Sequence, residues 1–236
     1  MSFKRGANSS ALISIKQMKL SPHQAIIKTM QPPAQQNSIS FITENIAQQG
    51  YAVVEQFINP QEIASLSAQA KILHSAGEMH KAKTGITKVE NSTLRGDFIH
   101  WIEASAASEA VVAYLNTMTE LQRAINQAFF LGLFELESHF AIYPPGAGYQ
   151  KHLDQFIGKE ERKVSCILYL NENWNSEDGG QLRMYLDKKD EKRFIDITPK
   201  AGTLVVFLSS DFLHEVLPAR RERISVTGWF RTRSLS

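Results

Sequence analysis

The apolar residues of this chain change their spacing near residue 133, and that change limits the folds that the chain can adopt. From Ser108 to about Leu133 they recur every three or four residues, which is typical of a long amphipathic helix. The later apolar runs are short and are separated by Gly, Pro, Asn and Asp; they cover 138–143, 164–170, 181–186, 194–198, 203–208 and 223–231. Helices followed by six such runs predict an α+β protein whose second half is a β-sandwich or barrel.

The domain organisation follows from composition along the chain. Residues 1–38 are polar and end in two prolines followed by Gln and Asn, which indicates an extension or linker. A chain of 236 residues is long enough for one β-rich domain with helical additions. We therefore predict a single domain over 39–236, with helical support over 39–135 and the β-core over 136–233.

Two helices and two strands are expected before the long helix. They are a helix from about residue 40 to Gly50, a strand over 51–57, a helix with Asn59 as its N-cap and Pro60 in its first turn, and a strand over 96–102. The polar segment 77–92 carries two glycines and three lysines. Because such a segment makes few apolar contacts, we expect an exposed loop or a weak hairpin of low local stability.

Charge and cysteine content narrow the possible partners. The formal net charge is +2, and we find no Lys/Arg block or nucleic-acid-reading motif, so we expect no nucleic acid partner. The one cysteine, Cys166, excludes an internal disulfide and a cysteine-based metal site. No stretch approaches the roughly 18 apolar residues of a membrane span, and no convincing signal peptide is found. We therefore expect no membrane partner and a cytoplasmic location.

His152 and Asp154 are the first candidate site residues. In an extended backbone, residues i and i+2 project to the same side, so an imidazole nitrogen and a carboxylate oxygen are presented together. A third ligand is predicted in His214, which lies beyond the run 203–208, where a sandwich can return the chain to the first pair. Two His and one carboxylate form the facial triad that binds Fe(II) and leaves open positions. Zinc hydrolases use the same ligand types, so the triad alone leaves the metal undecided.

Arg223 indicates the class of reaction. Period 2 places it on one strand face with Ser225, Thr227 and Trp229, which is an unusually polar face for a core strand. A buried arginine needs an anionic partner, and its planar guanidinium matches a carboxylate bidentately. The predicted partner is the distal carboxylate of 2-oxoglutarate. Together with the triad, Arg223 predicts a non-haem Fe(II), 2-oxoglutarate-dependent oxygenase.

Several motifs carry a family resemblance. They are Arg95-Gly96-Asp97, the Tyr- and Gly-containing approach from Tyr143 to Asp154, Tyr169-Leu170-Asn171, Gly179-Gly180-Gln181-Leu182, His214-Glu215-Val216, and Arg223 followed six residues later by Trp229. In these motifs the chain resembles the prolyl-hydroxylase-domain branch of the Fe(II)/2-oxoglutarate-dependent dioxygenases, which includes oxygen-sensing prolyl 4-hydroxylases and bacterial relatives. The resemblance implies a double-stranded β-helix, or jelly roll, buttressed by helices.

The resemblance also implies roles around the site. Tyr169 is similar to the tyrosine whose phenol helps the arginine to hold the distal carboxylate, and Tyr143 to the one beside the metal-binding end of the co-substrate. Thr227 resembles a threonine near this pocket, Trp229 a wall of it, and Tyr149 a tyrosine at the substrate entrance. The implied cofactor is Fe(II), with 2-oxoglutarate and O2 as co-substrates and ascorbate as a reductant. The other histidines are expected to be surface or packing residues: His23, His74, His80, His100 and His139.

The function implied by the resemblance is hydroxylation of a prolyl residue in a protein or peptide substrate, with release of succinate and CO2. Two alternatives stay open. One is an oxygenase of the same kind that acts on a free amino acid or other small molecule. The other is a non-catalytic metal-binding jelly roll, which would need the triad but no co-substrate arginine. Segment 77–92 has little in common with the animal enzymes, in which it closes over the substrate, so we expect a lid here and leave the substrate undecided.

Overall fold

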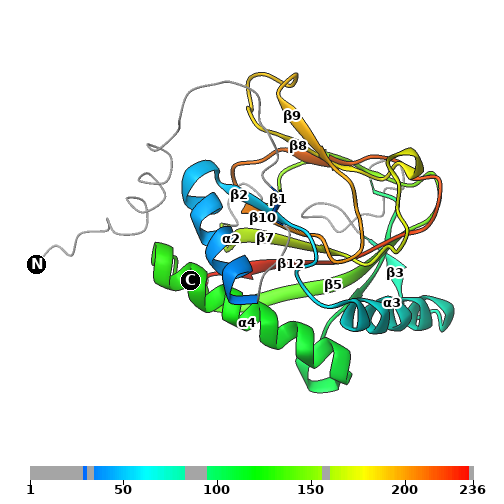
Figure 1. Cartoon of the computed structure of the whole chain (residues 1–236). Coiled ribbons are helices and arrows are strands. Elements are labelled where there is room, and N and C mark those ends of the chain that lie inside the picture. The colour runs from blue at the N-terminus through cyan, green and yellow to red at the C-terminus, as the bar shows by residue number, and fades with distance from the viewer. Residues whose placement is uncertain (1–28, 31–34, 83–94, 156–159, 234–236) are drawn as a thin grey trace, which may run out of the picture.

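The computed structural model describes residues 29–30, 35–82, 95–155 and 160–233, which form two largely antiparallel sheets (Figure 1). The larger sheet has the order β1 (Thr29–Met30), β2 (Tyr51–Val54), β10 (Leu204–Leu208), β7 (Arg162–Tyr169), β12 (Arg223–Arg231), β5 (Glu135–Tyr143), β4 (Phe98–Trp101) and β3 (His80–Lys81). The smaller sheet has the order β6 (Tyr149–His152), β11 (His214–Val216), β8 (Leu182–Tyr185) and β9 (Phe194–Ile197). Only the pair β1–β2 is parallel among these strands.

The helices cover one side of this sandwich. They are α2 (Gln35–Gln49), α3 (Pro60–Ser75) and α4 (Glu109–Phe129), with short 3-10 turns at η1 (Ala104–Ala106) and η2 (Ser176–Asp178). Figure 1 shows α2 and α4 on the face of the larger sheet that is turned away from β8 and β9. In the part of the chain that the structure describes, no helix has the length and apolar character needed to cross a membrane.

The long amphipathic helix predicted from residue 108 is α4, which begins after the N-cap Ser108. Its buried residues keep the predicted spacing of three and four: Val111, Tyr114, Met118, Leu121, Ile125 and Phe129. The helix ends four residues earlier than predicted, because Phe130 and Gly132 adopt left-handed backbone conformations (φ 53° and 66°). Asn126 stabilises this end, since its side chain both accepts from the Leu133 N–H and donates to the Leu133 carbonyl.

The predicted α+β class and the six predicted strands are confirmed. Each of the six apolar runs lies on a strand whose ends differ from the prediction by at most three residues. The sequence did not predict β6 and β11 as strands. They have four and three residues, which is too short for an alternating pattern to be recognised.

The end of segment 1–38, expected to be an extension or linker, is in contact with the sheet and helices. Helix α2 starts at Gln35, and its residue Ser38 is buried. Strand β1 lies even earlier in the chain and pairs with β2. Residues 1–28 and 31–34 lie outside the described part.

The expected lid is described only at its beginning, since residues 83–92 lie outside the described residues. Of the part that is described, His80–Lys81 form β3, which pairs with β4 at the edge of the larger sheet. Met79 and Ala82 on either side of β3 are buried. This stretch is therefore paired with the sheet, as in the hairpin alternative, while His80 and Lys81 are exposed.

The start of α3 gives a direct test of local stability. Asn59 Oδ1 accepts from the Glu62 N–H at 2.9 Å, and the Asn59 N–H donates to the Glu62 carboxylate at 3.1 Å, which is a capping box. Asn59→Ala should lower the free energy of unfolding by about 1 kcal/mol, measured by urea denaturation, because it leaves helix N–H groups unpaired. Gln61→Ala, at an exposed position in the same turn, is the control. Equal losses in both variants would contradict a role for the cap.

Candidate active site

The three predicted metal ligands meet at one end of the smaller sheet. His152 ends β6 and His214 begins β11, and these two residues lie opposite each other in the antiparallel pair. Asp154 follows His152 by two residues. Its Oδ1 lies 3.6 Å from His152 Nε2 and its Oδ2 lies 3.6 Å from His214 Nε2. Because the three ligand atoms are all within 4.8 Å of one another, one metal ion could contact all three.

Backbone carbonyls fix the orientation of both imidazoles. His152 Nδ1 lies 2.7 Å from the Gln150 oxygen, and His214 Nδ1 lies 3.1 Å from the Phe212 oxygen. A ring nitrogen that faces a carbonyl oxygen donates to it, and in a neutral ring this leaves the lone pair on Nε2. Both lone pairs are therefore available on the side where Asp154 lies.

Asp154 is held by hydrogen bonds that come from the larger sheet. Ser165 Oγ on β7 donates to Asp154 Oδ2 at 2.7 Å, and Ser209 Oγ lies 2.9 Å from Ser165 Oγ. Burial would raise the pKa of Asp154, but His214, His152 and the Ser165 hydrogen bond together hold that pKa well below its usual value. Asp154 is therefore ionised at neutral pH.

The protonation state of His214 also suits a metal ligand. Burial and the nearby His152 together lower the pKa of His214 to about 4, although Asp154 opposes this change. His214 is therefore neutral at pH 7. A metal ion needs neutral imidazoles and an ionised carboxylate as ligands, and these are the forms that the environment favours for His214 and Asp154.

Ser165 was not among the predicted site residues, although a lone serine within the apolar run 164–170 was an available signal. Ser165→Ala should weaken metal affinity by about 10–100-fold, because residues that orient a ligand have effects of that size. Competition between the protein and a chromophoric chelator for Mn²⁺ would measure the change. Ser138→Ala on β5 is the matched control, since its buried hydroxyl has no hydrogen-bond partner among the described residues. Wild-type affinity in Ser165→Ala would mean that Asp154 needs no such support.

Arg223 lies inside the protein at the start of β12 and is 2% exposed. Its Nε donates to the Gly180 carbonyl at 2.9 Å, and its Cζ lies 5.1 Å and 4.9 Å from the ring centroids of Tyr143 and Tyr169. Among the described residues, neither Arg223 Nη2 nor the Tyr169 hydroxyl has a hydrogen-bond partner. A buried cation that keeps an unpaired donor is costly, so the site fits an anionic ligand.

Tyr169 keeps its proton beside this cation. Burial raises the pKa of Tyr169 to about 12, although the positive charge of Arg223 opposes the rise. Its hydroxyl can therefore donate to the anion that Arg223 would bind. This arrangement is consistent with the role that the family resemblance implied for Tyr169, which is to help Arg223 to hold the distal carboxylate of 2-oxoglutarate.

The Gly179-Gly180 pair allows Arg223 to lie where it does. Both glycines have positive φ angles, 74° and 69°. A Cβ on Gly179 would lie 2.5 Å from the Pro218 oxygen, and one on Gly180 would lie 3.2 Å from Arg223 Cδ. Any other residue would therefore be strained at both positions, and one at position 180 would also crowd the arginine.

Most of the predicted site residues line one cavity of about 1320 Å³. They are Tyr143, Tyr149, His152, Asp154, His214, Arg223, Thr227 and Trp229. Tyr169 is fully buried beside Arg223 and does not line the cavity. The β-core thus brings the metal ligands and the arginine together around a single space, although they are up to 71 residues apart in the sequence.

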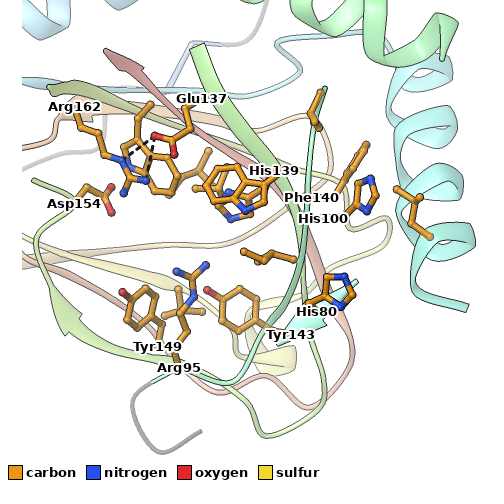
Figure 2. A pocket seen from close by; sticks show the side chains of 18 of the residues that line it. His80, Arg95, His100, Glu137, His139, Phe140, Tyr143, Tyr149, Asp154 and Arg162 are labelled. Carbon is orange, nitrogen blue, oxygen red and sulfur yellow. Dashed lines mark hydrogen bonds and ion pairs between the residues drawn. The ribbon is translucent and has the colours of Figure 1, made fainter. Parts of the chain in front are cut away.

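Tyr149 packs against one of the three predicted metal ligands. The Tyr149 ring, on β6, stacks on His152 with centroids 3.6 Å apart. The Arg95 guanidinium lies 4.8 Å from the centroid of the Tyr149 ring (Figure 2). Arg95 is in turn held by two hydrogen bonds to Asp97, of 2.6 Å and 2.9 Å. The sequence assigned no site role to Arg95 or Asp97, although the motif 95–97 was recognised. Their role here is to hold Tyr149 beside His152.

His139 was expected to be a surface or packing residue, and it is buried on β5, at 1% exposed. It also lines the cavity, as do His80 and His100. Period 2 places His139 on the same strand face as Tyr143, so the sequence contained a signal for its position beside the site.

A jelly-roll core that holds two histidines and one aspartate around one point, with a buried arginine in the same cavity, defines the class of Fe(II)/2-oxoglutarate-dependent oxygenases. The family model described as "2OG-Fe(II) oxygenase superfamily" matches residues 138–231, which contain all four of these residues. Among solved structures, a prolyl-4-hydroxylase of Pseudomonas putida is 44% identical with a TM-score of 0.75, and the match covers 83% of this chain and 100% of that one. The chain belongs to the prolyl hydroxylase branch of this superfamily.

Two further relatives come from animals. A prolyl hydroxylase of Trichoplax adhaerens, solved in complex with a hypoxia inducible factor peptide fragment, is 25% identical with a TM-score of 0.76 and covers 84% of this chain and 90% of that one. Egl nine homolog 1 of Homo sapiens is 31% identical over 207 residues, which are 84% of this chain and 47% of that protein. The chain spans about half the length of the Egl nine homologues that it matches.

Proposed function

We propose that this chain is an Fe(II)- and 2-oxoglutarate-dependent dioxygenase that hydroxylates a prolyl residue in a protein substrate, releasing succinate and CO2. The observation that carries the proposal is the buried Arg223, whose unpaired Nη2 shares a cavity with His152, Asp154 and His214. A non-catalytic metal site would have no use for a buried guanidinium that lacks an anion.

The residues present fit both Fe(II) and 2-oxoglutarate. Two imidazole nitrogens and one carboxylate oxygen are the donor set of Fe(II) oxygenases, and they leave positions open for a keto acid and O2. Arg223 and the neutral Tyr169 hydroxyl would hold the distal carboxylate. When bound, Fe(II) supplies the oxidative decarboxylation chemistry in which O2 gives one oxygen atom to succinate and one to the substrate.

The proposal for a protein substrate is supported by the relatives and by the cavity. The Trichoplax neighbour was solved with a peptide, and the matched relatives are prolyl hydroxylases. In this chain the cavity that contains the three metal ligands is also lined by Trp101, which is 43% exposed. An exposed indole at the rim offers an apolar surface for a pyrrolidine ring. We further propose ascorbate as the reductant and a reducing, cytoplasmic compartment, in which the buried thiol of Cys166 stays free.

The test is a search for hydroxylated protein. Cell extract proteins from the source organism would be incubated with the purified protein, Fe(II), 2-oxoglutarate and ascorbate, and analysed by mass spectrometry for one added oxygen atom at proline. We expect at least one prolyl site that needs both Fe(II) and 2-oxoglutarate, with the Asp154→Ala protein as the negative control. Hydroxylation of free proline or another small molecule, with no protein site, would favour the small-molecule alternative. Failure to consume 2-oxoglutarate under every condition would favour a non-catalytic metal protein.

A further inference from the structure

His139 is a buried histidine whose hydrogen-bonding groups are not used by the protein. Its ring lies against two indoles, 4.8 Å from the Trp101 centroid and 5.4 Å from the Trp229 centroid, and these two centroids are 6.5 Å apart. Within the described ranges, neither His139 Nδ1 nor His139 Nε2 has a hydrogen-bond partner. Figure 2 shows the His139 ring in the cavity wall, on the Arg162 side of Tyr143.

This arrangement has an energetic cost that packing alone does not explain. Burial lowers the pKa of His139 well below its usual value, and Arg95 and Arg162 lower it further, so the ring is neutral. A neutral imidazole has one N–H donor and one acceptor nitrogen, and a buried polar group without a partner is destabilising. An apolar residue of similar volume would fill the same space beside the indoles without burying an unpaired polar group. The histidine is therefore explained better by a ligand of the cavity than by packing.

Trp229 offers a second unused donor in the same wall. Its Nε1 is buried and has no partner among the residues that the structure describes. The Arg162 guanidinium lies 3.6 Å from its ring centroid and is itself bonded to Glu137, so the indole is held in place. His139 and Trp229 both line the cavity. The wall therefore carries two neutral N–H donors and no protein acceptor for either.

The two donors lie further along β5 and β12 than Tyr143 and Arg223, although the resemblance also assigned Trp229 and Thr227, which pairs with His139, to the 2-oxoglutarate pocket. His139 is four residues from Tyr143 along β5, about 13 Å at the rise of an extended strand, and Trp229 is six residues from Arg223 along β12, about 20 Å. His139 also contacts Trp101, the exposed indole at the rim. Trp229 is also beside Trp101, with centroids 6.5 Å apart, so both donor-bearing rings lie on the Trp101 side of the cavity.

We propose that His139 and Trp229 form a two-donor site for a backbone carbonyl oxygen of the substrate next to the target proline, so that His139 is a specificity-determining residue. The inference rests on the proposed function. A prolyl residue has no backbone N–H, so the backbone at the target can be recognised only through its carbonyl oxygens, and an oxygen needs donors. The wall supplies donors of this kind without a charge.

The test compares three variants with the wild type. His139→Met keeps a similar apolar volume but removes both nitrogens, and His139→Gln keeps a donor. Ser138→Ala is the control, because it removes an unpaired buried hydroxyl from the next residue of β5, outside the cavity. The probes are 15-residue synthetic peptides with one central proline that reproduce the hydroxylated sites from the extract screen. The readouts are the melting temperature of the ligand-free protein and the Michaelis constants for peptide and for 2-oxoglutarate.

We expect opposite effects on stability and on substrate binding. His139→Met should raise the melting temperature by a few degrees, because it removes unpaired buried groups. The same variant should raise the Michaelis constant for the peptide about tenfold, which corresponds to one lost hydrogen bond of about 1.4 kcal/mol. His139→Gln should stay within about threefold of the wild type for the peptide, as expected when a donor is retained. Ser138→Ala should match the wild type in both Michaelis constants.

Three results would overturn the inference. The first is an unchanged Michaelis constant for the peptide in His139→Met. The second is a higher Michaelis constant for 2-oxoglutarate with no change for the peptide. The third is a lower melting temperature with no kinetic change, which would mean a packing role. If His139→Met does not fold, an additional His139→Leu variant takes its place in the comparison with His139→Gln. The proposed function fails separately, because in that case the wild type itself would hydroxylate no peptide.

Discussion

Replacing Asp154 by alanine should abolish coupled hydroxylation. It should also reduce metal affinity more than the loss of a residue that only orients a ligand, which costs about 10–100-fold. Asp154 supplies the one anionic ligand of the cluster that the described residues form, and without it two neutral imidazoles would have to hold a dication. Affinity would be measured by anaerobic titration with Fe(II) or Mn²⁺ against a chelator. Turnover would be measured as succinate formed per hydroxylated peptide.

A matched control separates the loss of a ligand from the loss of a charge. Asp196→Ala also removes one carboxylate from a strand of the smaller sheet, but Asp196 pairs with Arg183, away from the cluster. This variant should retain metal affinity and turnover. Asp154→Glu should retain part of the affinity, because the charge remains while the longer side chain displaces the oxygens. Wild-type activity in Asp154→Ala would be fatal to the triad assignment.

The sequence predicted those parts of the fold and site that are encoded locally. Strands β5 and β12 are nine residues long and apolar enough for an alternating pattern to be recognised. The pairing of His152 with Asp154 is also local, since it needs only extended backbone. Arg223 was recognisable because a charged residue begins an otherwise buried strand.

Features that depend on the pairing of distant segments could not be predicted in the same way. Strands β6 and β11 are short, and their register alone sets His152 opposite His214. Ser165 bonds to Asp154 across the gap between the two sheets, a contact that the apolar run 164–170 does not reveal. Gly180 supports Arg223 from 43 residues away. His214 could be predicted as a third ligand, but the register that places it could not, and neither Ser165 nor Gly180 could be matched with its partner.

His139 shows the limit of reasoning from a family pattern. Its strand position was predictable from Tyr143, because the two residues are four apart on one face. Its unpaired nitrogens became evident only when the surrounding indoles were placed around it.

Replacing Arg223 by alanine should raise the Michaelis constant for 2-oxoglutarate at least about thirtyfold, because truncating one partner of a buried charge pair costs about 2–5 kcal/mol. Metal affinity should change far less. In the part of the chain that the structure describes, Arg223 contacts Gly180, Tyr143 and Tyr169 and forms no hydrogen bond or ion pair with the three ligands. Steady-state kinetics with varied 2-oxoglutarate, together with metal titration of the same preparation, would measure both effects.

Two further substitutions give this prediction its specificity. Arg223→Lys should lie between alanine and the wild type, because an ammonium keeps the charge but lacks the planar fork that matches a carboxylate. Arg221→Ala is the positional control: Arg221 is two residues earlier, is exposed, and donates to the Glu172 and Asn173 carbonyls outside the cavity. It should leave the Michaelis constant for 2-oxoglutarate unchanged. The same unchanged constant in Arg223→Ala would place the co-substrate elsewhere, and the buried guanidinium would then need a different anion.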